Sequence, residues 1–106
     1  MVKQGDIVKI SLDPAAGHEQ AGYRPAIVIS NDLFNKMHKL TIVCPITRTD
    51  RTHPFHVRLD ERTQTEGVIL CDQIRVLDLL ARDAKIIESA PGDILSEVTD
   101  IIKGFL

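Results

Sequence analysis

Residues 17–31, GHEQAGYRPAIVISN, join a polar loop to an apolar strand, and this junction decides how the chain folds. The first half is polar and bounded by glycines, as in a loop that approaches a ligand. The second half, around 26–29, is an unbroken apolar run of the kind that forms a buried strand. Glu19, Tyr23 and Arg24 lie at the junction, where a proline then fixes the backbone. The pattern predicts functional side chains on a loop held by a rigid scaffold.

Short apolar segments with strand character lie on both sides of this stretch. They are, in chain order, residues 6–12, 25–30, 40–46, 55–59, 68–77 and 84–88. The polar pair Asp72-Gln73 interrupts the segment 68–77, so we expect it to satisfy buried backbone groups or to belong to a site. After Pro91, apolar residues recur at helical spacing up to Phe105. Five or six short strands and a late helix predict a mainly β, α+β fold: a small, curled, mainly antiparallel barrel.

Composition limits the class of protein. A length of 106 residues predicts a single domain, 1–106, and a net charge of −2 argues against coating nucleic acid through bulk charge. A local basic surface remains open, because Arg48, Arg51, His53, His56 and Arg58 lie close together in the sequence. No apolar run approaches the ~20 residues of a membrane span, and the N-terminus lacks a signal-peptide pattern, which predicts a cytoplasmic location.

The cysteines and histidines do not form a metal-binding motif. Cys44 and Cys71 each lie in an apolar segment, so we expect buried, reduced thiols rather than a disulfide. There is no CxxC, and the HxxH of His53 and His56 surrounds Pro54, which disfavours the helical face that such a motif requires. The sequence therefore predicts no metal site and no cofactor.

Phosphodiester chemistry is the reaction class that the junction fits. The arginine fork of Arg24 suits a phosphate, and the hydroxyl of Thr47, at a strand end, can hold a phosphate oxygen. RNA supplies its own nucleophile, the 2′-hydroxyl, so its cleavage needs a base, an acid and stabilisation of the anionic phosphorane. Glu19, His18 and Asp72 are candidates for the proton transfers. The alternatives are a surface salt bridge for the arginine and a turn role for the threonine.

A set of segments carries a resemblance to a known family. They are GDIV at 5–8, DPAAGHEQAGYRPAIVIS at 13–30, VCPIT at 43–47, GVILCDQIRVLD at 67–78 and the closing helix. In this order and combination, the chain resembles the MazF/PemK (Kid) toxins of bacterial toxin–antitoxin pairs over nearly its whole length. The resemblance implies an SH3-like barrel that acts as a homodimer. It also implies metal-independent cleavage of single-stranded RNA at short motifs, which leaves a 2′,3′-cyclic phosphate and a 5′-hydroxyl and inhibits translation and growth.

The resemblance also suggests catalytic residues. The arginine of the family's RP motif falls on Arg24, the threonine of its P-x-T motif on Thr47 and its loop glutamate on Glu19. In Kid-like members an arginine and an aspartate near the fifth strand act as acid and base. The aspartate matches Asp72, but Leu70 stands where the arginine would be. We therefore expect Glu19 to transfer the proton, with the aspartate orienting groups or binding RNA.

Further polar residues, within the segments that carry the resemblance or directly after VCPIT, are expected to bind RNA. The set is His18, Gln20, Tyr23, Arg48, Arg51, Asp72 and Gln73. The histidine matches a position that contacts RNA in the Kid branch, and the tyrosine is suited to stacking on a base. The expected protein partner is a cognate antitoxin with an acidic, disordered tail that lies in the RNA groove.

Two other classes of function stay open at this point. The topoisomerase poison CcdB is similar in fold to this family, so the chain could be a non-catalytic toxin that binds a protein such as DNA gyrase. The pair Arg24 and Thr47 separates the two, because only the enzyme needs it. The other class is a bare nucleic-acid-binding module that uses Arg48, Arg51 and Arg58.

Overall fold

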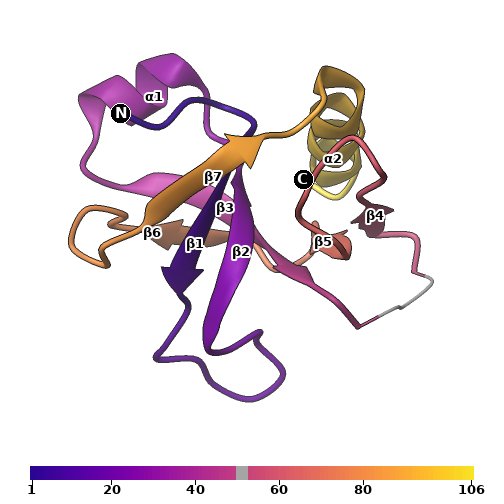
Figure 1. Ribbon diagram of the computed structural model, residues 1–106, viewed down its shortest axis with the longest axis horizontal. Helices are drawn as coiled ribbons and strands as arrows, with labels where there is room; N and C mark the ends of the chain where they lie inside the picture. Colours follow the sequence, from indigo (N-terminus) through magenta and orange to yellow (C-terminus); the bar gives the residue numbers. More distant parts are fainter. Residues whose placement is uncertain (50–52) are drawn as a thin grey trace.

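The computed structural model describes residues 1–49 and 53–106 and contains a β-sheet with two helices (Figure 1). The elements are β1 (Asp6–Ser11), β2 (Tyr23–Val28), α1 (Asp32–Met37), β3 (Thr41–Thr47), β4 (His56–Arg58), β5 (Val68–Leu70), β6 (Arg75–Leu77), β7 (Lys85–Ser89) and α2 (Gly92–Gly104). The predicted mainly β fold with a late helix is confirmed. Within the described ranges, no helix has the length and apolar character needed to cross a membrane.

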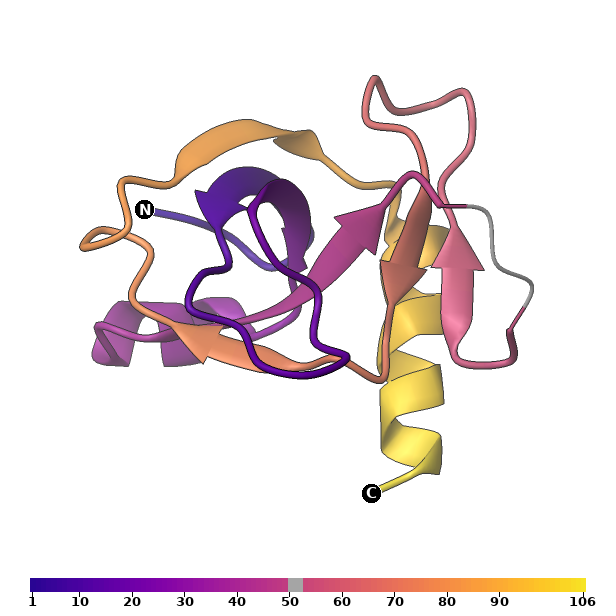
Figure 2. The same cartoon turned by 90° about the horizontal axis from the view of Figure 1, so that it is seen from below.

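The strands form one curled, antiparallel sheet in the order β4-β5-β3-β2-β1-β7. Strand β3 pairs with β2 along one edge, and along the other it pairs first with β6 and then with β5. Figure 2 shows this sheet from below, with α2 beside β4 and β5. Among the described strands β4 and β7 are the two ends of the order, so the sheet curls without closing.

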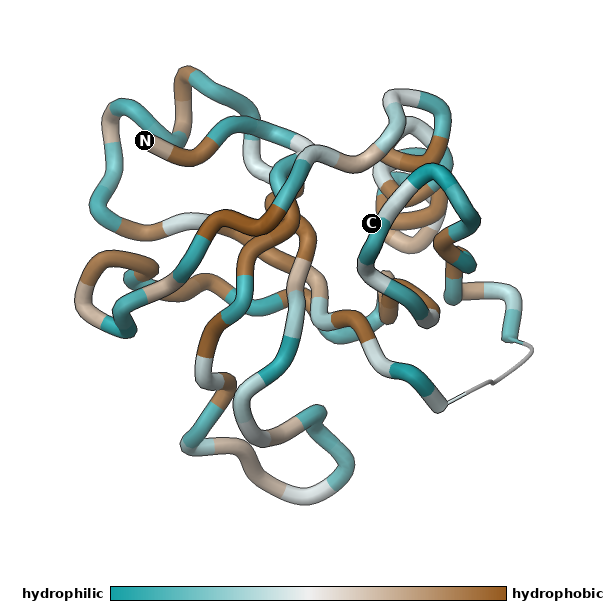
Figure 3. The backbone as a smooth tube through the Cα atoms, in the orientation of Figure 1, coloured by the Kyte–Doolittle hydropathy of each residue, from teal (hydrophilic) through white to brown (hydrophobic). Residues whose placement is uncertain are grey.

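Strand alternation divides the apolar residues between the two faces of the sheet. One cluster, the helix-side core, lies between the sheet and α2. It contains Ile7, Ile27, Cys44, Ile46, Val57, Ile69 and Cys71 with Ile94, Val98 and Ile102 of the helix. The other cluster, the barrel core, contains Val8, Ile10, Leu12, Ala26, Val28, Val43, Leu77 and Leu79. Figure 3 shows hydrophobic (brown) stretches along the central strands and in α2.

The predicted single strand at 68–77 is wrong, because the chain breaks there into β5 and β6. The pairing moves from Ile46–Ile69 to Val43–Arg75, so the partner chain has more residues than β3 over this interval. The surplus forms a turn in which the N–H of Gln73 donates to the carbonyl of Leu70 (3.1 Å). A proline in β3 lacks an N–H at this point, which favours such a break in the ladder. Asp72 and Gln73 therefore lie in a turn, not within a strand.

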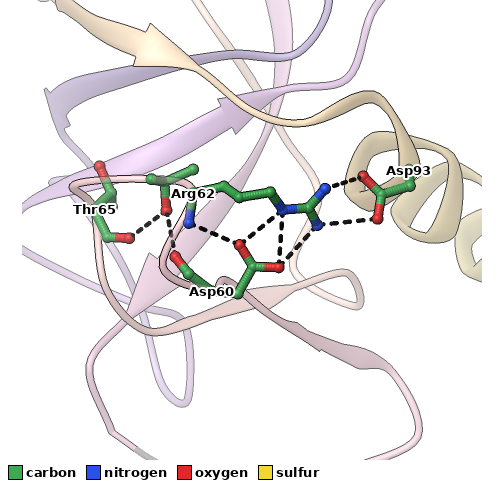
Figure 4. A network of polar contacts seen from close by, with 5 residues as sticks. Asp60, Arg62, Thr65 and Asp93 are labelled. Atoms are coloured by element: carbon green, nitrogen blue, oxygen red, sulfur yellow. Dashed lines mark hydrogen bonds and ion pairs between the residues drawn. The ribbon is translucent and has the colours of Figure 1, made fainter.

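The loop 60–67 is held against both α2 and β7. Arg62 donates from Nη1 and Nη2 to the carboxylate of Asp93 (2.9 and 3.0 Å) and also binds Asp60 (Figure 4). These hydrogen bonds from the guanidinium hold the pKa of both carboxyls below its usual range. On the other side, Glu88 accepts from the N–H groups of Gln64 (3.0 Å) and Thr65 (2.8 Å). The loop 60–67 is thus held in a fixed position next to the end of β3.

Gly67 ends this loop and lies against the backbone of Thr47. Its φ is +127°, a region that favours glycine, and a Cβ there would lie 2.8 Å from the carbonyl carbon of Thr47. We expect Gly67→Ala to lower the free energy of unfolding by roughly 1–3 kcal/mol, because both strain and a backbone clash oppose it. Chemical denaturation of the purified variant measures the change.

Gly104→Ala is the matched control for this substitution. A Cβ at Gly104 meets open space at the end of α2, so its effect is expected to lie between zero and a gain of about 1 kcal/mol. Equal stability of the wild type and Gly67→Ala would contradict the close approach described for Gly67.

Candidate functional site

Strand register places several polar side chains on the sheet face that lies opposite α2. Directly opposed residues of antiparallel strands share a face, and successive residues of one strand alternate. The linking pairs are Ala26–Pro45, Thr47–Val68, Arg58–Val68 and His56–Leu70. We call the resulting surface the polar face; its members are Arg24, Thr47, His56 and Arg58 with Val68 and Leu70. Their neighbours in sequence, such as Ile46 and Ile69, instead pack in the helix-side core.

Arg24 is held in place by the loop that precedes β2. Its Nε donates to the carbonyl of Ala21 (2.8 Å). With the amide oxygen of Gln20 turned toward the guanidinium, that oxygen accepts from Nε (2.6 Å) and Nη2 (3.3 Å) of the arginine. A guanidinium fixed in this way is pre-organised for an anion such as a phosphate.

Thr47 ends β3 and is almost fully buried, with 4% of the residue exposed. Its Oγ1 accepts a hydrogen bond from the N–H of Thr49 (3.2 Å). This hydrogen bond shows that the side chain of Thr47 does stabilise the turn after β3. Because the oxygen accepts that bond, the hydroxyl proton stays available for donation to a ligand oxygen. The side chain can serve both the turn and a phosphate.

The long loop between β1 and β2 is anchored on the turn between β5 and β6. The backbone N–H of Gln20 donates to Oε1 of Gln73 (2.7 Å), and that of Gly22 to Oδ1 of Asp13 (3.2 Å). Because Gln20 also binds Arg24, these contacts join the arginine to the turn that carries Asp72. Gln73 thus acts as an anchor for the loop.

Glu19 lies on the same loop, and its carboxylate binds back to the backbone of that loop. Its Oε1 accepts from the N–H of Ala16 (2.6 Å), and the side chain is exposed. Among the contacts of the described residues, none joins this carboxylate to Arg24 or Thr47. His18 is exposed beside it. The structure therefore brings the predicted arginine and threonine to one face and leaves the glutamate on the exposed loop.

His56 is a site residue that sequence reasoning did not select for chemistry. Its Nε2 lies 3.4 Å from Oδ1 of Asp72, and its ring centroid lies 4.7 Å from that of His53. The pairing of His56 with Leu70 brings this imidazole next to the turn after β5. Correct pairing of β4 with β5 is the signal that would have found it, and spacing along the sequence does not show that pairing.

The two cysteines near this site are buried thiols with raised pKa values. Cys44 and Cys71 are both free and buried, as predicted. Burial, and then the nearby Asp72 carboxylate, raise the pKa of Cys71 to about 12, and burial raises that of Cys44 as well. We therefore expect both thiols to stay protonated at neutral pH.

A hollow of about 430 Å³ lies beside the first residues of β2. Its lining includes Lys9, Tyr23, Arg24 and Arg48, and the lysine Nζ lies 5.2 Å from the centre of the tyrosine ring. A neighbouring hollow of about 540 Å³ shares Arg48 and Glu66 with the first but adds the carboxylates of Asp60 and Glu61, which disfavour a phosphate. The predicted RNA ligands Tyr23 and Arg48 thus line the first hollow, while Arg51 lies outside the described residues.

Comparison with known proteins gives a consistent result. A family model described as PemK-like, MazF-like toxin of type II toxin-antitoxin system matches residues 3–106. The endoribonuclease PemK of Escherichia coli is 42% identical over 101 residues, which cover 92% of this chain and 76% of that protein. The endoribonuclease toxin ChpB of Escherichia coli strain K12 is 43% identical over 100 residues, covering 90% and 85%.

Solved structures agree with this match. The crystal structure of MazF (Form-I) from Deinococcus radiodurans superimposes with a TM-score of 0.92 and 36% identity, covering 98% of this chain and 94% of the other. The crystal structure of MazE-MazF (Form-III) from the same organism gives a TM-score of 0.86 and 34% identity over 98% and 94%.

We expect Gln73→Ala to release the loop that carries Gln20. The backbone N–H of Gln20 then loses its acceptor, and its amide hydrogen exchange should quicken by at least tenfold, since an exposed loop has little other protection. Amide exchange followed by NMR measures this rate. Gln64→Ala is the control, because only its backbone contacts Glu88. Unchanged exchange at Gln20 in Gln73→Ala would show that the anchor is not needed.

Proposed function

The chain belongs to the PemK-like, MazF-like toxin family of type II toxin–antitoxin systems, and we propose that it is a sequence-specific endoribonuclease. Relatives at 42% and 43% identity are named endoribonucleases, and both matches span most of the two chains compared. The proposed substrate is single-stranded RNA, cleaved without a metal by attack of the 2′-hydroxyl. The products are a 2′,3′-cyclic phosphate and a 5′-hydroxyl, and the outcome is inhibition of translation and growth.

The placement of Arg24 and Thr47 on one face is the observation that carries this proposal. The arginine is fixed by Ala21 and Gln20, and the threonine hydroxyl keeps a proton to donate. In the proposed mechanism both stabilise the negative charge that develops on the phosphorane oxygens. Groups held in advance in this way lower the barrier because they need no reorganisation during the reaction.

One of the two proton transfers, removal of the 2′-hydroxyl proton, is assigned to a group near this pair. We propose Glu19 as the group that removes the 2′-hydroxyl proton, since it is an exposed carboxylate on a loop joined to the arginine through Gln20. Asp72, in the anchoring turn beside His56, is proposed to orient the RNA. Leu70 stands where Kid-like members have an arginine, and its side chain cannot donate a proton to the leaving 5′-oxygen.

RNA binding is proposed to extend over both sides of β2. The set comprises His18, Gln20, Tyr23, Arg48, Arg51, Asp72 and Gln73. Tyr23 and Arg48 line a hollow with Lys9, where an exposed ring and two cations suit a base and its phosphate.

The cytoplasm is the proposed place of action, because cellular RNA is the proposed substrate. Residues 1–106 are proposed to act as one toxin domain.

The non-catalytic, CcdB-like alternative receives less support. A protein that only binds another protein has no need of Arg24 and Thr47 on one face. The bare RNA-binding module is less consistent still, since the named relatives are enzymes.

RNA cleavage in excess EDTA tests the proposal directly. The wild type is expected to cut a long single-stranded RNA into discrete fragments that end in a cyclic phosphate. Arg24→Ala and Thr47→Ala should each lower the cleavage rate roughly 10²–10³-fold, because each removes a donor to the developing charge. Thr47→Ser should keep most of the activity, and Lys85→Ala, an exposed cation on β7, should keep all of it.

Intact RNA from folded wild-type protein would overturn the ribonuclease proposal and favour the protein-binding toxin. Cleavage that survives loss of both side chains would leave the enzyme standing but move its site elsewhere.

We further propose a homodimer and a cognate antitoxin with an acidic, disordered tail. A MazE-MazF complex is among the similar structures, which supports an antitoxin partner for this chain. An acidic tail would compete with RNA for Arg24 and Arg48 by presenting carboxylates in place of phosphates. The purified antitoxin should therefore abolish RNA cleavage at a near-stoichiometric ratio, and a tail-deleted form should bind but inhibit less. Full inhibition without the tail would contradict this mode of action.

A further inference from the structure

Three potential metal-ligating side chains meet at the pairing of β4 with β5. His53 lies three residues before β4, His56 is the first residue of that strand, and Asp72 comes from the turn after β5. The two segments are joined by the N–H of Cys71, which donates to the carbonyl of Phe55 (3.0 Å). One ligand atom from each of the three residues lies within 4.8 Å of the others.

The spacing of the closest pair matches that of two ligands on one metal ion. Zinc bonds to nitrogen and oxygen are about 2.0–2.2 Å, so neighbouring ligand atoms of a tetrahedral site lie about 3.3–3.6 Å apart. His56 Nε2 and Asp72 Oδ1 are 3.4 Å apart, which is long for a hydrogen bond between nitrogen and oxygen. To coordinate the same ion, His53 has to move closer to His56 and Asp72, and its side chain is exposed.

The imidazole of His56 has a polar atom left over. Its side chain is only 9% exposed, and its Nδ1 is buried with no hydrogen-bond partner among the described residues. Buried ring nitrogens nearly always have a partner. An ion bound through Nε2 would not reach Nδ1 on the other edge of the ring, so the spacing of the ligand atoms, and not this nitrogen, supports a metal site.

His53 is well placed to complete the set. Its ring lies tilted beside that of His56, and its Nδ1 accepts from the N–H of Phe55 (3.1 Å). That hydrogen bond is exposed, so water can replace it when the imidazole turns to coordinate an ion. Phe55 itself packs edge-on against Phe105 of the C-terminal segment, which holds the segment in place.

We propose that His53, His56 and Asp72 form a binding site for one divalent transition-metal ion such as Zn²⁺. Two imidazoles and a carboxylate suit such ions, whereas Mg²⁺ and Ca²⁺ prefer sites made only of oxygen ligands. The sequence predicted no metal site because Pro54 excludes a helix between the histidines. Strand pairing brings the ligands together instead.

Occupation of this site has a consequence for the proposed ribonuclease, and that consequence rests on the proposed function. The ion does not take part in cleavage. Because it would occupy Asp72, which is proposed to orient the RNA, it should slow cleavage by competition.

Metal binding is tested first without RNA. The full chain is stripped with EDTA, transferred to EDTA-free buffer and titrated with Zn²⁺ by calorimetry. We expect one ion per chain, and affinity lowered at least tenfold in each of His53→Ala, His56→Gln and Asp72→Asn. Co²⁺ supplies a spectroscopic readout, because its visible absorption intensifies on binding to a site of low coordination number, and this signal should vanish in the same variants.

His18→Ala and His38→Ala are the matched controls, since both change a histidine outside the cluster and should bind Zn²⁺ like the wild type. His53→Ala removes an exposed side chain and should leave the thermal unfolding temperature unchanged, so the test holds even if His56→Gln fails to fold. Wild-type affinity in His53→Ala and Asp72→Asn, or no binding by the wild type, would overturn the site.

The competition is tested separately. Zn²⁺ should slow RNA cleavage by the wild type and have at least tenfold less effect on His53→Ala. Zn²⁺ that binds without slowing cleavage would refute the competition, whereas absence of any cleavage would refute the ribonuclease and leave the metal site standing.

Discussion

Strand β3 pairs with β2 on one edge and with β6 and β5 on the other, so the rest of the sheet is positioned relative to it. Alternation along this one strand sends Cys44 and Ile46 into the helix-side core and Thr47 to the polar face. A register shift of one residue would exchange these destinations, placing the threonine under α2 and the isoleucine outside. The apolar pattern of the strand therefore fixes both the core and the position of the candidate catalytic hydroxyl.

Charge is distributed locally rather than in bulk. The chain carries a net charge of −2, yet the polar face and the adjoining hollow bring Arg24, Lys9 and Arg48 into one region. Many of the carboxylates nearby are engaged elsewhere: Asp60 and Asp93 bind Arg62 (Figure 4). Glu88 binds the backbone of the loop 60–67. A molecule of this composition can therefore attract a phosphate chain at one place while remaining acidic overall.

Sequence patterns were sufficient for the fold, and together with the family resemblance they suggested Arg24 and Thr47 as the central pair of the candidate site. Alternation identified the strands, helical spacing identified α2, and the change from loop to strand at Arg24 located the junction. The break between β5 and β6 was not predictable, since it depends on how β3 changes partners across space. His56 was missed for the same reason: its neighbour Asp72 is far away in the sequence, and a pairing of short strands brings the two together. Local patterns encode elements, whereas contacts between distant segments require the register.

The helix-side core joins residues from opposite parts of the chain, because Ile7 of β1 packs in the same cluster as Ile94 and Val98 of α2. During synthesis on a ribosome, strands β1 to β6 are made before the helix that covers the sheet, and β7 directly precedes it. A nascent chain that lacks α2 would expose the apolar face of the sheet. It would also lack the hydrogen bonds between Arg62 and Asp93 that hold the loop 60–67 in place. Because the helix-side core is incomplete without α2, we expect the sheet to reach its final packing only after this late helix has been made and docked.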